Sequence, residues 1–158
     1  GNSDVIPYVK QFYSGGTNSL RGFRARSVGP GTFVSDQTDN LQVDQVGDIK
    51  LEANMEYRFT MAGKMKGAVF ADAGNVWLLR EDPQRPSGEF EWSDFISEVA
   101  FDGGFGLRYD PGVIVIRLDL AAPLRRPDLP EGDRWVFDDF DRQWSRNFIL
   151  NFAIGYPF

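Results

Sequence analysis

Apolar and polar residues alternate along several long stretches of the chain. From Asp48 to Thr60, apolar residues occupy every second position and polar or charged residues fill the positions between them. A period of two is typical of a β-strand whose two faces meet different surroundings. Five further strands are predicted, at residues 5–12, 66–78, 99–110, 113–124 and 147–158. The pattern therefore predicts an all-β chain with about six antiparallel strands.

The lengths of the strands and of their connections point to a membrane. The strands are about 12 residues long, whereas about five or six is usual and about 9–11 residues let a tilted strand cross a bilayer. The connections alternate in length, as in outer-membrane barrels with long extracellular loops and short periplasmic turns. Long connections are predicted at residues 14–47, 79–97 and 125–146, and short ones at 61–64 and 111–112.

The two faces of the predicted strands differ in the same sense throughout. One face carries bulky aromatic and aliphatic side chains and the other carries charge, which is typical of strands with lipid outside and water inside. A soluble ligand-binding barrel more often turns its apolar face inward. The pattern favours the antiparallel strands of a transmembrane outer-membrane β-barrel, with a soluble β-barrel or sandwich as the alternative. Charged residues of the later strands are expected to pair with one another in the interior: Arg108, Asp110, Arg117 and Asp119.

The composition argues against several kinds of chemistry. The chain has no Cys and no His, so disulfides and thiolate metal sites are ruled out and the commonest general base is missing. No nucleophile elbow or metal cluster accompanies the acids that could support acid–base chemistry: Asp72, Asp102, Asp110 and Asp119. We therefore predict no enzymatic activity and no cofactor. The net charge of −6, without a basic stripe, argues against a nucleic-acid partner.

One stretch stands apart from the strands. Residues 12–23, FYSGGTNSLRGF, have neither a strand nor a helix period, and their glycines and their Thr-Asn-Ser run are typical of a tight turn. Taken alone, the stretch predicts a solvent-exposed loop. Arg21 would need a carboxylate partner if the loop left bulk water. Two acids, Glu56 and Asp72, lie in phase with the non-lipid faces of the next two strands.

Five segments of the chain, in order, resemble the C-terminal barrel half of the BamA/TamA superfamily, the bacterial surface antigen family of outer-membrane proteins. They are QFYSGGTNSLRGF, LEANMEYRF, AVFADAGNVW, GLRYDPGVIVIRLDLAAPL and NFAIGYPF. The resemblance implies that residues 1–158 are a single C-terminal fragment of a sixteen-stranded barrel in the bacterial outer membrane. This fragment would hold about six strands and the long loop at 14–47, without the POTRA repeats of the family.

The resemblance also implies a role for the loop. The loop would fold back into the barrel, where Arg21, followed by Gly22 and Phe23, would meet Glu56 on the first strand after it and Asp72 on the second. We call these five residues the latch. At the other end of the chain, the resemblance assigns a C-terminal sorting signal, read by the assembly machinery, to Tyr156 and Phe158.

The implied function is the insertion, assembly or translocation of outer-membrane proteins. The barrel would act by adding client strands at a seam, one side of which would be the last strand, weakened by Gly155. The expected partners are outer-membrane lipids, unfolded client proteins and periplasmic or accessory assembly subunits. A TamA-like accessory is preferred over a central assembly protein or a two-partner secretion transporter. The alternative is a passive channel or a structural barrel.

Overall fold

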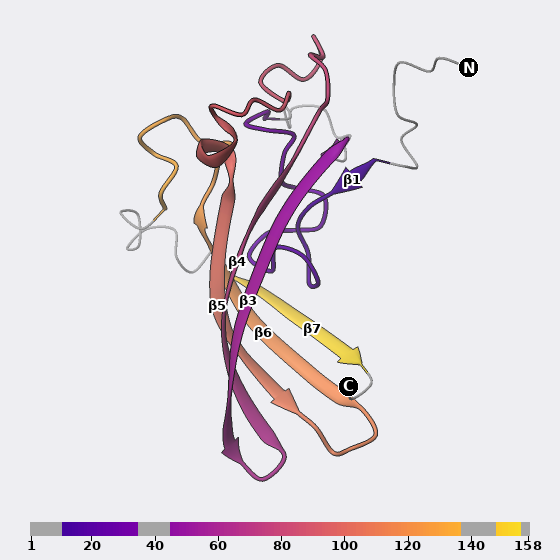
Figure 1. Cartoon of the computed structure of the whole chain (residues 1–158). Helices are drawn as coiled ribbons and strands as arrows, with labels where there is room; N and C mark the ends of the chain where they lie inside the picture. The colour runs from indigo at the N-terminus through magenta and orange to yellow at the C-terminus, as the bar shows by residue number, and fades with distance from the viewer. Residues whose placement is uncertain (1–10, 35–44, 137–147, 156–158) are drawn as a thin grey trace, which may run out of the picture.

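Five long antiparallel strands form one curved sheet along the length of the molecule (Figure 1). The computed structural model describes residues 11–34, 45–136 and 148–155. Each strand of the sheet pairs with the one before it in the chain, which confirms the predicted antiparallel all-β class. The strands are β3 (Ile49–Ala62), β4 (Met65–Trp77), β5 (Ala100–Tyr109), β6 (Val115–Arg125) and β7 (Ile149–Gly155).

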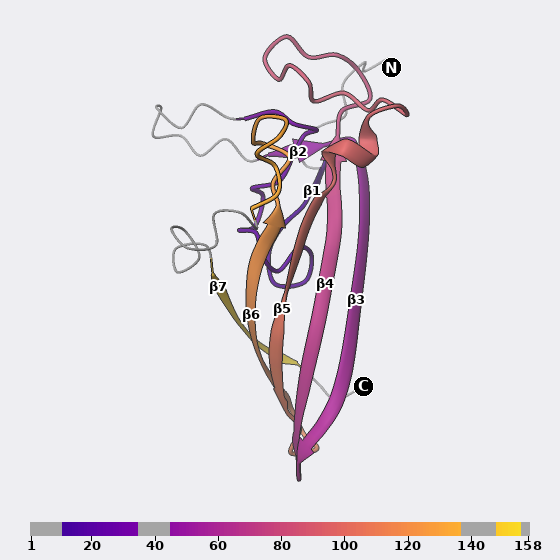
Figure 2. The same ribbon diagram turned by 90° about the vertical axis from the view of Figure 1, so that its left-hand side faces the viewer.

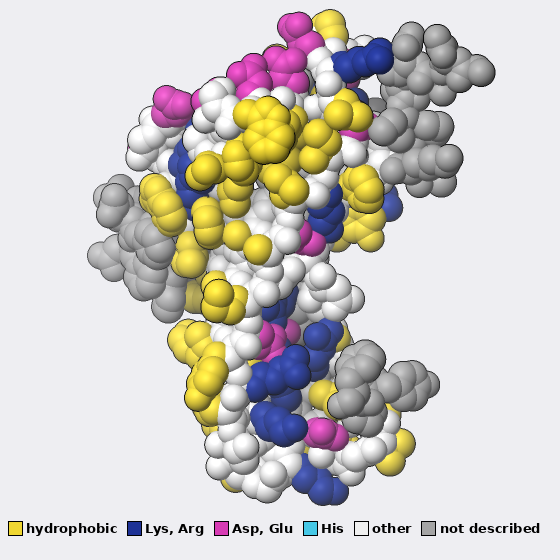
Figure 3. Space-filling view, viewed as in Figure 1, with side chains coloured by type: hydrophobic (Ala, Val, Ile, Leu, Met, Phe, Trp, Pro, Cys, Tyr) yellow, Lys and Arg dark blue, Asp and Glu magenta, His cyan; other side chains and the backbone are white. Residues whose placement is uncertain are grey.

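The alternation in the sequence becomes two unlike faces of this sheet. On the face that we call outer, large apolar side chains are exposed, among them Met55 at 76%, Phe105 at 70% and Phe152 at 61%. On the opposite, inner face, charged and polar side chains gather, and Figure 3 shows them in the lower half of the molecule with hydrophobic side chains beside them. Several polar residues of the inner face are buried: Asp72, Asp102, Arg108, Asp119 and Asn151.

The connections sort by length between the two ends of the sheet. Strands β3 and β4 are joined by Gly63 and Lys64 alone, and β5 and β6 by residues 110–114; both turns lie at the lower end in Figure 1. The connection 78–99 is longer and lies at the upper end, and so do residues 126–136, the first part of the long connection between β6 and β7. Gly63 and Gly112 have φ of 53° and 104°, a backbone region that residues with a Cβ rarely adopt. The predicted alternation of long and short connections is therefore found.

Some strand boundaries differ from the prediction. The first predicted strand lies mostly outside the described residues; Phe12 and Tyr13 form the short strand β1 (Phe12–Tyr13), which pairs with β2 (Val46–Gly47). The turn after β5 is longer than predicted, because the Gly112 amide donates a hydrogen bond to the Asp110 carboxylate and β6 begins only at Val115. The last predicted strand is described from 148 to 155.

The connection between β4 and β5 contains one short helical turn. A 3-10 helix, η2 (Phe95–Glu98), follows Asp94 at the N-cap position. The Ser93 hydroxyl donates to the Asp94 carboxylate, and the side chain of Asp94 makes no capping hydrogen bond to the helix backbone. In the part of the chain that the structure describes, no helix is long and apolar enough to cross a membrane.

The segment after β1 folds against the inner face of the sheet, in its upper half (Figure 2). The pairing of Phe12 with Gly47 in β1 and β2 closes the base of this loop. Side chains of the loop and one residue of β5 make a buried apolar cluster: Leu20, Phe23, Val28 and Ala100. Many inner-face positions of the strands at this height are small, namely Ala68, Gly74, Ala100, Gly104 and Ala121, and the loop occupies the room that they leave.

If the outer face meets lipid, a charge placed on it should be costly. We expect Phe105→Arg, in the middle of β5, to lower the free energy of unfolding of the full-length protein in a bilayer by about 2–4 kcal/mol. The measurement is urea unfolding after refolding into lipid vesicles, with Phe105→Leu as the apolar control. Equal stability of the Arg and Leu variants would contradict a lipid-facing outer surface.

Candidate functional site

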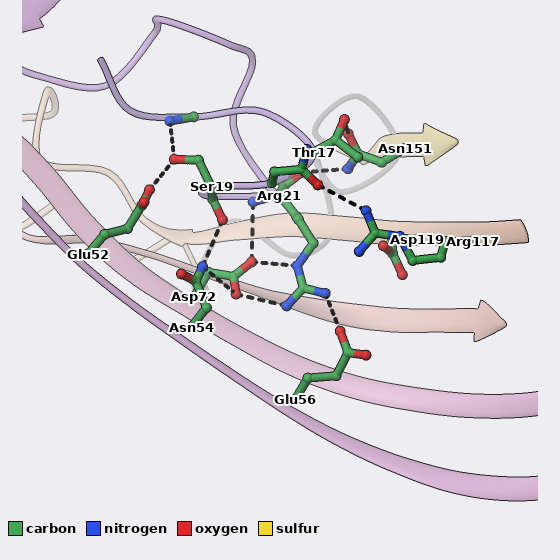
Figure 4. A network of polar contacts seen from close by, with 12 residues as sticks. Thr17, Ser19, Arg21, Glu52, Asn54, Glu56, Asp72, Arg117, Asp119 and Asn151 are labelled. Carbon is green, nitrogen blue, oxygen red and sulfur yellow. Dashed lines mark hydrogen bonds and ion pairs between the residues drawn. The ribbon is translucent and has the colours of Figure 1, made fainter. Parts of the chain in front are cut away.

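Arg21 lies at the centre of a buried polar network between the loop and the sheet (Figure 4). Its Nε and Nη2 donate to the two carboxylate oxygens of Asp72 at 2.8 and 2.9 Å. Its Nη1 donates to Oε2 of Glu56 at 2.6 Å. The planar guanidinium thus serves one carboxylate with two parallel bonds and a second with its remaining nitrogen, a geometry that an ammonium group cannot reproduce. Strands β3 and β4 each supply one acid.

Two further contacts fix the position of Arg21. Its backbone amide donates to Oδ2 of Asp72 at 3.3 Å, and its guanidinium carbon lies 3.5 Å from the centroid of the Phe70 ring, a favourable cation–π arrangement. Burial acts to lower the pKa of Arg21, but the hydrogen bonds to Asp72 and Glu56 outweigh it and raise that pKa above its ordinary value. Arg21 therefore carries its charge at every physiological pH.

Polar residues of β3 brace the turn that precedes Arg21. Glu52 accepts hydrogen bonds from the hydroxyls of Ser14, at 3.1 Å, and Ser19. Nδ2 of Asn54 donates to the Ser19 carbonyl at 2.8 Å and to Oδ1 of Asp72 at 3.0 Å. With Glu56, these β3 residues occupy alternate positions of one strand. The period of two therefore directs all three side chains to the loop.

Gly22 lets the loop approach the sheet closely. A Cβ at this position would overlap the Cβ of Asp102 on β5 and lie 2.9 Å from the carbonyl carbon of Ala122 on β6. Phe23, the next residue, is buried in the apolar cluster at 8% exposure. The Arg-Gly-Phe sequence thus combines a charged anchor, a point of backbone contact and an apolar anchor.

Asp102 is an acid of the site without a cation. It pairs with Asp72 in the register of β4 and β5 and is 1% exposed. Its charged neighbour across the strand pair is the carboxylate of Asp72. Two buried carboxylates side by side repel each other when both are ionised, so an ionised Asp102 destabilises the site.

Glu56 also connects the loop to a cluster of charged side chains lower on the inner face, formed by Arg58, Arg108 and Asp119. Its Oε1 accepts from Nε of Arg58 at 2.7 Å and its Oε2 from Nη2 of Arg108 at 2.9 Å. Arg108 also pairs with Asp119 of β6. One carboxylate therefore contacts three guanidinium groups, counting that of Arg21, and this offsets its burial.

The expected mutual pairing of the later charged residues forms only in part. Arg108 pairs with Asp119, but Nη2 of Arg117 donates to Oδ1 of Asn18 in the loop at 2.9 Å. Asp110 instead lies 3.8 Å from Nζ of Lys66, near the lower turns. The prediction missed the Arg117 contact because the loop, and not the neighbouring strand, occupies the space next to it.

The last described strand also contacts the loop. Nδ2 of Asn151, on β7, donates to the carbonyl oxygen of Arg21 at 2.8 Å. Its Oδ1 accepts from the hydroxyl of Thr17 at 3.1 Å. On the inner face, the loop is thus held near both edges of the described sheet, by β3 and β4 toward one edge and by β7 at the other.

The whole chain, residues 1–158, matches the model of the Omp85 superfamily domain. The chain belongs to the Omp85 superfamily. It is similar to outer membrane protein assembly factor BamA of Neisseria meningitidis serogroup B, with 24% identity over 155 residues. That alignment covers 87% of this chain and 19% of the relative, so the chain spans about a fifth of the length of the curated relative that it matches.

Membership of the Omp85 superfamily decides between the fold classes that the sequence pattern left open. The chain is part of a bacterial outer-membrane β-barrel, and the soluble alternative is wrong. The outer face of the sheet is the one that such a barrel turns to lipid, and the inner face lines its interior. The network around Arg21 therefore lies on the interior side of the barrel wall.

The structure brings the described latch residues together. Arg21, Glu56 and Asp72 are in direct contact, and Gly22 and Phe23 lie against the sheet beside them. Tyr156 and Phe158 lie outside the described residues, so the sorting signal stays a prediction.

Other residues of the site were missed: Glu52, Asn54, Phe70, Asp102 and Asn151. Each lies on the inner phase of its strand, a signal that the period of two carries. Which inner-phase residues meet the loop depends on the path of the loop.

Removing the guanidinium should destabilise the barrel strongly. We expect Arg21→Ala to lower the free energy of unfolding by about 3–5 kcal/mol, because Asp72 and Glu56 would be left buried without their partner. Arg21→Lys should regain only part of this loss, because an ammonium group lacks the fork. The measurement is urea unfolding of the full-length protein, with Arg24→Ala, an exposed arginine of the same loop, as control. An Arg21→Lys variant as stable as wild type would contradict the role of the fork.

Neutralising Asp102 should have the opposite effect. We expect Asp102→Asn to raise the free energy of unfolding by about 1 kcal/mol, because the amide can donate to Asp72 and the repulsion between two buried carboxylates is removed. The matched control is Asp119→Asn, which takes a carboxylate from Arg108 and should lower the same quantity. A loss of stability in both variants would show that the charge of Asp102 is needed.

Proposed function

We propose that the protein to which this chain belongs inserts or assembles proteins in the bacterial outer membrane. The observation that carries the proposal is the anchored loop, which Arg21 ties to β3 and β4 and Asn151 ties to β7. A passive pore has no need for an interior loop that is tied to strands at both edges of this part of its wall. The Omp85 family match and the neisserial relative, an assembly factor, support the same conclusion.

We infer that residues 1–158 form the C-terminal part of a sixteen-stranded barrel, with residues 14–47 as the loop that closes back into it. The POTRA repeats that receive clients would belong to other parts of the same protein. The match of this chain to about a fifth of the relative's length supports that division.

The mechanism that we propose is strand addition at a seam beside β7. In the described part of the chain, β7 pairs with β6. In the whole barrel its other edge would close on a strand outside residues 1–158, and opening there would free the backbone groups of β7 for an incoming strand. The outward side chains of β7 are apolar and exposed: Leu150, Phe152 and Ile154. A client strand paired there would place its own apolar face in lipid. The process exchanges backbone hydrogen bonds and needs no covalent chemistry, so no catalytic residues are proposed.

The latch would hold the interior in place while the seam opens. The loop packs against the upper inner face and contacts β3, β4 and β7. Because the ion pairs to Glu56 and Asp72 join neighbouring strands away from the seam, they can persist when β7 moves. The barrel would thus open at one place without losing the rest of its shape.

The proposed partners are unfolded outer-membrane client proteins, the lipids of the outer membrane and accessory or periplasmic subunits. Tyr156 and Phe158 are proposed as the signal that the machinery reads when the protein itself is assembled. The sequence resemblance favoured a TamA-like accessory, whereas the neisserial relative favours a central assembly factor. The two roles differ in how many client proteins depend on the protein.

Depletion and complementation in cells test this proposal. Depleting the full-length protein should reduce folded outer-membrane barrels, many kinds for a central factor and a few kinds for an accessory. Wild type and Arg24→Ala should restore them, and Arg21→Ala should restore about a tenth or less at equal protein level, because the latch no longer holds. The measurement is the amount of folded barrels in isolated outer membranes. Normal barrel content after depletion, together with steady ion conductance by the purified protein, would favour the passive channel.

A further inference from the structure

Asn151 bonds to the loop through both the nitrogen and the oxygen of its side-chain amide. The side chain donates to the Arg21 carbonyl at 2.8 Å and accepts from the Thr17 hydroxyl at 3.1 Å (Figure 4). The residue is 8% exposed, so water reaches these two bonds poorly. Thr17 and Arg21 lie on either side of the loop tip. One amide group therefore forms hydrogen bonds to the loop on both sides of this tip.

Asn151 differs from the other inner-face residues of β7 in being able to form side-chain hydrogen bonds to the loop. Strand β7 is held to β6 by seven residue pairs, from Val115–Gly155 to Ala121–Ile149. The other inner-face positions of β7 in the described range are Ile149, Ala153 and Gly155, whose side chains cannot form hydrogen bonds. In the described part of β7, Asn151 is therefore the residue whose side chain bonds the strand to the loop.

The two attachments of the loop differ in strength. Toward β3 and β4, the loop is held by charge-assisted bonds from Arg21 to Glu56 and Asp72. Toward β7, it is held by two neutral hydrogen bonds. Charge-assisted bonds are about twice as strong as neutral ones. If β7 moves away from the loop, the bonds of Asn151 break first and the loop stays with β3 and β4.

We propose that Asn151 is a positioning residue that couples the last strand to the anchored loop and releases it when the seam opens. With its two bonds made, β7 is held against the loop and the seam is closed. With them broken, β7 is free to exchange partners while Arg21 keeps the loop in place. The proposal rests on the proposed function for the meaning of the seam, but the coupling itself can be measured without any client protein.

Amide hydrogen exchange of the full-length protein in lipid nanodiscs tests the coupling. Asn151→Leu keeps the size of the side chain and removes both bonds, and Thr17→Val removes one of them from the loop side. We expect Asn151→Leu to speed exchange about tenfold in peptides that cover β7 and in those that cover residues 14–28. Thr17→Val should give a smaller increase in the same peptides. Ala153→Ser, on the same face of β7, should exchange like wild type.

The pattern of exchange decides the outcome. Faster exchange in both β7 and the loop, with the β3–β4 hairpin unchanged, supports the coupling. Faster exchange in β7 alone, or unchanged exchange in both segments, overturns it. If Asn151→Leu does not fold, the Thr17→Val variant decides by the same criterion, because it leaves β7 intact.

A separate measurement keeps this inference apart from the proposed function. If Arg21→Ala impairs client assembly but Asn151→Leu leaves exchange unchanged, the proposed function stands and the coupling fails. If exchange is coupled but client assembly never depends on this protein, the coupling stands and the proposed function fails.

Discussion

The inner organisation of this chain depends on one buried guanidinium balanced by two carboxylates. A charge taken out of water is costly unless it is paired and fully hydrogen-bonded. Arg21 meets this requirement with two parallel bonds to Asp72 and one to Glu56. Because those acids belong to neighbouring strands, Arg21 satisfies its charge by binding both strands at this position on the sheet. The charge requirement therefore helps to fix the location of the loop as well as to stabilise it.

The rest of the site follows from that location. Small inner-face residues leave room for the loop, and Gly22 lets its backbone touch β5 and β6. Glu52 and Asn54 then bind the turn before Arg21, and Asn151 binds its carbonyl from the far side. The strong bonds lie toward β3 and β4 and the weak ones toward β7. In the proposed opening beside the last strand, this unequal arrangement would leave the loop attached to β3 and β4.

The strands could be predicted from the sequence because they depend on a period of two, whereas the latch is implied by the resemblance to the BamA/TamA superfamily. The alternation from Asp48 to Thr60 and the lengths of the connections are local properties. The inward direction of Glu56 and Asp72 follows from the same phase. Asn151 and Asp102 could not be assigned to the site, because their neighbours depend on strand register and on the path of the loop. The bond from Asn151 to Arg21 joins residues 130 positions apart, and no local pattern records such a contact.

A double-mutant cycle between Arg21 and Asp72 is the most direct test of the central claim. It compares the free energy of unfolding of wild type, Arg21→Ala, Asp72→Ala and the double variant, all as full-length protein in a bilayer. If the pair anchors the loop, the effects are strongly non-additive, with a coupling energy of about 2–3 kcal/mol. Effects that add to within about 0.5 kcal/mol would mean that the two side chains stabilise the protein independently, and that the loop is not held by this interaction.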